Sequence, residues 1–224
     1  MSYARRGLRA LGVSILAALG LMAVTAGGAS ASGTFLVQEL AGVWDAAILG
    51  KGDNPLDNEN RLLVLNLKIE FFCHSGSAGG KINQAGHGHT TVEFKECFAS
   101  GVNQDGDLIG EICELENDIV AKALAQVVLH STKPYILFSP LEGEFYGVIN
   151  TEPCPIPTAS LKGNVVANIS NPDGDNLVKL LSTKAMLGLF TTDKLFYGKN
   201  EAHLDVDGNV ELSGAHENKA WGAA

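Results

Sequence analysis

Hydrophobic and polar residues alternate along much of the chain, most clearly at residues 63–73. The even side carries the polar residues Asn66, Lys68 and Glu70. The odd positions are all apolar: Leu63, Leu65, Leu67, Ile69, Phe71 and Cys73. An apolar residue at every second position is typical of a strand with one face on the core. The pattern therefore predicts one strand over residues 63–73, with Cys73 on its buried face.

Weaker alternation recurs further along, separated by stretches rich in turn-forming residues at 75–80 and 171–176. The alternating segments are residues 90–96, 135–138, 144–150, 161–169 and 202–212. This succession predicts a mainly β protein, an antiparallel β-sandwich or barrel.

Three Asp-Gly dipeptides fall between apolar runs, at residues 105–106, 173–174 and 207–208. Glycine supplies the positive φ that hairpin turns require, so each pair predicts a turn. For the last pair, a three-residue loop at 206–208 would set Leu204 opposite Val210 and keep the apolar residues on one face.

Two segments fit either a helix or a strand. Residues 117–129 carry apolar residues at helical spacing, with Asn117 or Asp118 as a cap, but they also alternate. Residues 176–190 are similarly ambiguous.

The first 31 residues have the features of a cleavable secretory signal. Arg5, Arg6 and Arg9 precede an apolar stretch that is too short to span a bilayer, and Ala29-Ser30-Ala31 supplies a small-residue cleavage site. We therefore expect an exported protein with no membrane span after cleavage, composed of a signal peptide (1–31) and a single all-β domain (32–224).

The composition is acidic, with a formal net charge of −9 that becomes −12 once the three leader arginines are removed. Such a surface repels nucleic acid and anionic lipid and favours solubility. Nucleic-acid partners are therefore not expected, and charge alone identifies no other partner.

The four cysteines, Cys73, Cys97, Cys113 and Cys154, predict two disulfides, because an even number in an exported chain usually forms pairs. Their spacing contains no CxxC pair, which argues against a zinc site. Strand alternation places Cys97 on the polar face of its segment. It therefore favours Cys97 with Cys113 and Cys73 with Cys154.

Residues 92–221 contain a series of short motifs: VEFKEC, GEIC, PLEGEFYGVINTEPC, LKGNVVANI and NVELSGAHENKAW. Their order resembles a group of uncharacterised exported all-β proteins of high-GC Gram-positive bacteria. The resemblance implies no particular activity. Since the segment after the second cysteine is mostly strand in that group, it favours a strand for residues 119–129.

His87-Gly88-His89 could offer two imidazoles to a metal ion, with His74, Glu93 or Asp57 as a third ligand. A polar, glycine-rich loop between two strands explains the motif better, because no third ligand lies at short spacing. Calcium could bind the oxygen-rich segments 103–107, 171–175 and 205–209, although hairpin turns account for them without an ion. We therefore assign no metal ligand and no cofactor.

No catalytic motif is evident. The segment 75–79 lacks the order of a hydrolase nucleophile elbow, and Trp44 and Trp221 are more typical of terminal strands packed on a core than of exposed binding residues. The sequence favours a non-enzymatic binding or structural module outside the cell. The alternatives are a small secreted hydrolase using carboxylates such as Glu142 and Glu144 near Tyr146, and a calcium-stabilised surface protein.

Overall fold

The computed structural model describes seven parts of the chain: residues 31–37, 45–53, 60–103, 109–110, 112–169, 177–182 and 194–224. Several predictions fall outside them: residues 1–30 of the signal, the Asp-Gly pairs at 105–106 and 173–174, Trp44, Asp57 and residues 183–190.

The described residues form strands and two short 3-10 turns, with no α-helix among them, which confirms the mainly β prediction. The strands are β1 (Ala31–Ser32), β2 (Phe35–Val37), β3 (Asp45–Asp53), β4 (Asn60–Val64), β5 (Ile69–Asn83), β6 (His87–Gly101), β7 (Cys113–Glu114), β8 (Ile119–His130), β9 (Lys133–Pro140), β10 (Phe145–Ile149), β11 (Ala159–Gly163), β12 (Val165–Ile169), β13 (Leu177–Ser182), β14 (Leu195–Tyr197), β15 (Asn200–Ser213) and β16 (Trp221–Ala223).

The sheet curls until it closes on itself. Its hydrogen-bonded path runs β3-β5-β6-β8-β9-β12-β13-β15, and β15 then pairs with β3. All these pairs are antiparallel. Of the two architectures that the sequence left open, the chain thus adopts a barrel of eight strands.

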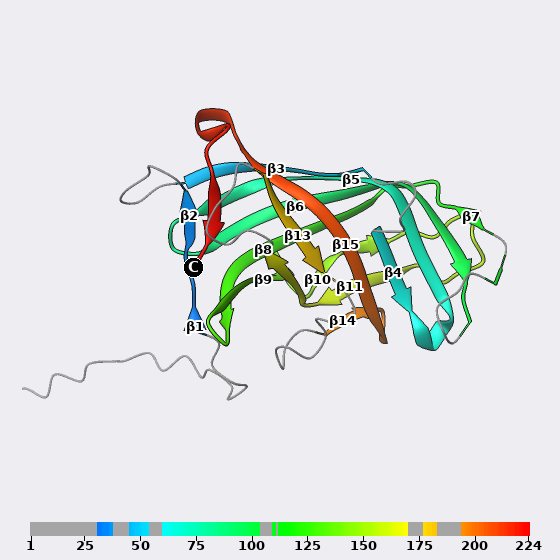
Figure 1. Cartoon of the computed structure of the whole chain (residues 1–224). Coiled ribbons are helices and arrows are strands. Elements are labelled where there is room, and N and C mark those ends of the chain that lie inside the picture. The colour runs from blue at the N-terminus through cyan, green and yellow to red at the C-terminus, as the bar shows by residue number, and fades with distance from the viewer. Residues whose placement is uncertain are drawn as a thin grey trace, which may run out of the picture.

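Additional strands cover the two ends of the barrel (Figure 1). At one end, β2 and β16 form a separate two-stranded sheet. Toward the other end, β14 extends from β15 and continues into β11 and β10, while β4 bridges β15 and β5. The lumen therefore lies between two covered ends.

The long alternating segment 63–73 is not one strand. It divides into β4 and β5, joined by the 3-10 turn η1 (Leu65–Leu67) and by Lys68, whose φ of 54° is left-handed. Apolar residues occupy both parities at the end of β4, so alternation did not reveal which face is buried. Leu62 and Val64 are buried, whereas Leu67 is exposed.

The predictions of a hairpin at Asp207-Gly208 and of a turn-rich connection at residues 75–80 are also wrong. Asp207 and Gly208 lie within β15 and pair with Leu181 and Leu180 of β13, which holds the dipeptide extended. Residues 75–80 lie within β5, paired with both β3 and β6.

Residues 161–169 form two strands instead of one, since Gly163 (φ 103°) interrupts them. The strand favoured for residues 119–129 is confirmed as β8, and Leu177–Ser182 of the second ambiguous segment is strand β13.

The presence of two disulfides is confirmed, but their predicted pairing is wrong. The bonds join Cys73 to Cys97 and Cys113 to Cys154. Cys73 and Cys97 are directly opposite residues of β5 and β6. Glu96, with a left-handed φ of 51°, interrupts the alternation of β6 and turns Cys97 toward the core, where Ala99 is also buried. Cys154 is then left for Cys113.

Candidate binding site in the barrel lumen

Two buried clusters of side chains fill the ends of the barrel. Phe71 and Tyr197 belong to one, with ring centroids 5.3 Å apart. Phe35 and Trp221 belong to the other, 6.2 Å apart, and the Trp221 indole N–H donates a hydrogen bond to the Val210 carbonyl at 3.1 Å. Trp221 thus packs the terminal strand β16 onto the core, as predicted from the sequence for this tryptophan.

A cavity of about 180 Å³ lies within the barrel, lined by residues of both clusters. Trp221 and Phe35 line it from β16 and β2, while Tyr146 and Leu161 line it from β10 and β11. Eight-stranded barrels have an interior that side chains can just fill or that can hold one small ligand. Here the side chains leave part of it open.

Small residues create this space. Side chains alternate across a strand, so every second residue faces the lumen. At many of those positions this chain carries glycine or alanine, including Gly76, Ala78, Ala121, Ala123, Ala125, Ala167 and Gly208. Since protein interiors are normally close-packed, these small residues leave space in the lumen that larger side chains would fill.

Three polar side chains belong to the lining: Asn60, Thr90 and Tyr146 are each at least nine-tenths buried. The Thr90 hydroxyl donates to the Gly79 carbonyl at 3.3 Å, and the Tyr146 hydroxyl donates to the Phe138 carbonyl at 2.7 Å. Burial raises the pKa of Tyr146, and a backbone hydrogen bond from Val165 opposes this shift. The Tyr146 hydroxyl therefore keeps its proton at neutral pH.

Three further polar residues, Ser77, Asp207 and Asn209, line the cavity from the opposite parity of their strands. Core residues of β15 such as Leu204 and Val210 occupy even positions. Asp207 and Asn209 thus belong to the outer face of β15 and border the cavity next to Gly208.

The proposed metal ligands do not come together. His87 and His89 are exposed on β6. His74 instead contacts the Phe98 ring, at a centroid distance of 5.0 Å, and lies 3.7 Å from the Glu96 carboxylate. Glu93 pairs with Lys95 at 3.1 Å. Within the described part of the chain, no three His, Cys, Asp or Glu residues are grouped so that they could hold a metal ion.

The proposed carboxylate site does not form either. Glu142 and Glu144 are exposed between β9 and β10, whereas Tyr146 is buried and faces the lumen. The potential calcium segment 205–209 is part of strand β15, while residues 104–107 and 171–175 lie outside the described residues.

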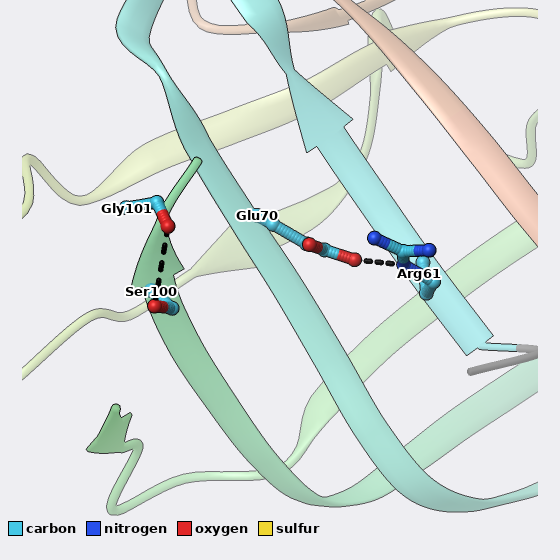
Figure 2. A network of polar contacts seen from close by, with 4 residues as sticks. All are labelled: Arg61, Glu70, Ser100 and Gly101. Carbon is cyan, nitrogen blue, oxygen red and sulfur yellow. Dashed lines mark hydrogen bonds and ion pairs between the residues drawn. The ribbon is translucent and has the colours of Figure 1, made fainter. Parts of the chain in front are cut away.

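One buried charge was not anticipated from the sequence. Glu70, on the polar side of the predicted strand, is only 1% exposed and forms an ion pair with Arg61 of β4 (Figure 2). Its neighbour across the β5–β6 pair is the buried Ser100, whose hydroxyl donates to the Gly101 and Gly110 carbonyls at 3.3 Å. Glu70 does not line the cavity. Its ion pair instead links β4 to β5.

Comparisons with protein-family models, with curated proteins and with solved structures find no match to this chain. Among the described residues, no helix has the length and apolar character needed to cross a membrane. The two disulfides are typical of proteins in an oxidising compartment. The cavity is therefore the feature on which a functional argument must rest.

Proposed function

We propose that this protein is a non-enzymatic binding module that holds a small apolar molecule in the lumen of its barrel. The observation that carries the proposal is the cavity lined by small and apolar side chains, because binding sites for small molecules are concave and mostly apolar. Burial of an apolar ligand there would be driven by the hydrophobic effect.

The volume limits the size of the ligand. An engineered cavity of roughly 150 Å³ lined by aliphatic and aromatic residues binds benzene. The present cavity, at about 180 Å³, accordingly suits a compact molecule of similar or slightly larger size, and not an extended lipid chain.

The lining also favours binding over catalysis. A hydrolase needs a nucleophile or paired acid and base groups in reach of one substrate. Thr90 and Tyr146 already donate their hydroxyl protons to backbone carbonyls, and Glu142 and Glu144 lie elsewhere.

The compartment forms part of the proposal. A leader with arginines, an apolar stretch and a small-residue cleavage site, together with two disulfides, supports export and action at or outside the cell surface.

Thermal unfolding with increasing toluene tests the proposal. A ligand that binds only the native state raises its stability in a saturable way. We expect such a rise for the wild type and its loss in Ala123→Leu, which fills the lumen from β8. Val120→Leu, on the exposed face of the same strand, is the matched control and retains the rise. Equal behaviour of the two variants, or no saturable rise in the wild type, would contradict the proposal.

A further inference from the structure

Asn60 is the one inward-facing side chain of the lining whose hydrogen-bonding groups are not engaged by the described residues. It begins β4, where Asn60, Leu62 and Val64 are buried at alternate positions. Asn60 therefore faces inward, and its partner across the β4–β15 pair is Val206, which also lines the cavity. The side chain is 7% exposed.

The other two inward polar groups of the lining, on Thr90 and Tyr146, donate to the Gly79 and Phe138 carbonyls. The Asn60 amide makes no comparable bond within the described parts of the chain. The described residues do not completely enclose the amide atoms of Asn60, so these atoms can accept a partner from the cavity that Asn60 lines. An amide offers two donors and one acceptor, so it can bind a hydroxyl or a carbonyl group.

Charge further restricts the ligand. Asp207 is the one charged residue among the described lining, and it belongs to the outer face of β15. Since no cationic or anionic side chain faces the lumen from these residues, a charged ligand would be buried without a counter-ion, which is strongly unfavourable.

We propose that the ligand is a compact neutral molecule, mostly hydrocarbon, with one hydroxyl or carbonyl group that hydrogen-bonds to the Asn60 side-chain amide. This inference rests on the proposed function and specifies the ligand class of the same cavity.

Phenol and toluene test this inference because they have nearly the same size and phenol carries a hydroxyl group where toluene carries a methyl group. The measured quantity is the ratio of their dissociation constants, determined by isothermal titration for each protein. A comparison of this ratio between variants cancels the different hydration of the two free ligands.

In Asn60→Leu we expect the preference for phenol to fall about tenfold relative to the wild type, the size of effect expected for one net hydrogen bond. Toluene binding by the same variant is retained and shows that the lumen has folded. Asn60→Val also removes the amide and has a smaller side chain, so the same ratio is measured for it in case leucine does not fit in the lumen.

Thr91→Val is the control, because Thr91 lies on the exposed face of β6 and outside the lining, and we expect its ligand ratio to match the wild type. If toluene binds and the ratio is unchanged in both Asn60 variants, the role of Asn60 is refuted while the proposed function stands. If neither ligand binds the wild type, both proposals fail.

Discussion

Three glycines in β5 provide a sharp test of how the barrel wall is built. A Cβ atom added at Gly76 would face the lumen and lie 3.4 Å from the Phe94 ring, an ordinary contact. At Gly79 it would meet nothing within 4 Å. At Gly80 it would lie 2.1 Å from the carbonyl oxygen of His89, on the neighbouring strand.

Alanine at these positions should therefore have different effects. Where the backbone accepts it, alanine stabilises by about 0.4–1 kcal/mol through the unfolded state. Burial of one extra carbon at Gly76 adds about 0.8 kcal/mol, for a total of about 1–2 kcal/mol. Gly79→Ala gains only the contribution that acts through the unfolded state, because its methyl group contacts no other residue. Gly80→Ala must displace the backbone of β6, for which overpacking predicts a loss of about 1–3 kcal/mol.

Urea unfolding of the three variants measures these differences as shifts in the midpoint at constant m-value. The expected order of stability is Gly76→Ala, then Gly79→Ala, then the wild type, then Gly80→Ala. A Gly80→Ala variant as stable as the wild type would refute the β5–β6 register. A destabilised Gly76→Ala variant would indicate that the lumen has no room beside Phe94.

Further predictions follow from the crosslinks and buried polar groups. Replacement of Cys113 and Cys154 together by serine opens a bridge with a sequence separation of 41 and should lower stability by about 4 kcal/mol, as measured by urea unfolding; an unchanged midpoint would contradict it. Because burial raises the pKa of Tyr146 above its unfolded value, the contribution of Tyr146 to stability should be constant well below pH 10 and fall at higher pH by about 1.4 kcal/mol per unit; Tyr146→Phe should therefore reduce the slope of stability against pH above pH 10, and an unchanged slope would contradict this. Arg61→Leu leaves the Glu70 carboxylate buried without this counter-ion, so it should destabilise more than Arg61→Leu combined with Glu70→Leu; the reverse order in thermal unfolding would argue against the ion pair.

The sequence was informative wherever alternation reflected a strand in one uninterrupted environment. The β class could be predicted in this way, whereas the pattern of residues 119–129 fitted a helix as well as the strand β8 that the structure shows. Left-handed residues were the main source of error. Lys68 divides an apparently continuous strand, and Glu96 redirects Cys97 to the core, yet neither is a glycine that would mark the change in conformation.

Long-range pairing explains the other failures. Asp207-Gly208 has the chemistry of a turn, but its pairing with β13, which is distant in sequence, holds it extended. The cavity was not predictable from the sequence because it, too, depends on long-range pairing of strands. Ala123 and Gly76 are unremarkable in the sequence, and only the closure of the barrel brings them around a common space.

The most direct test of an open apolar lumen is a methyl NMR titration of the alanine-labelled protein with toluene. We expect saturable shifts for the lining methyl groups of Ala123, Ala125 and Ala167 and little change at Ala202, which is buried outside the lining. Lining methyl groups that do not respond, or that respond no more than Ala202, would contradict this expectation.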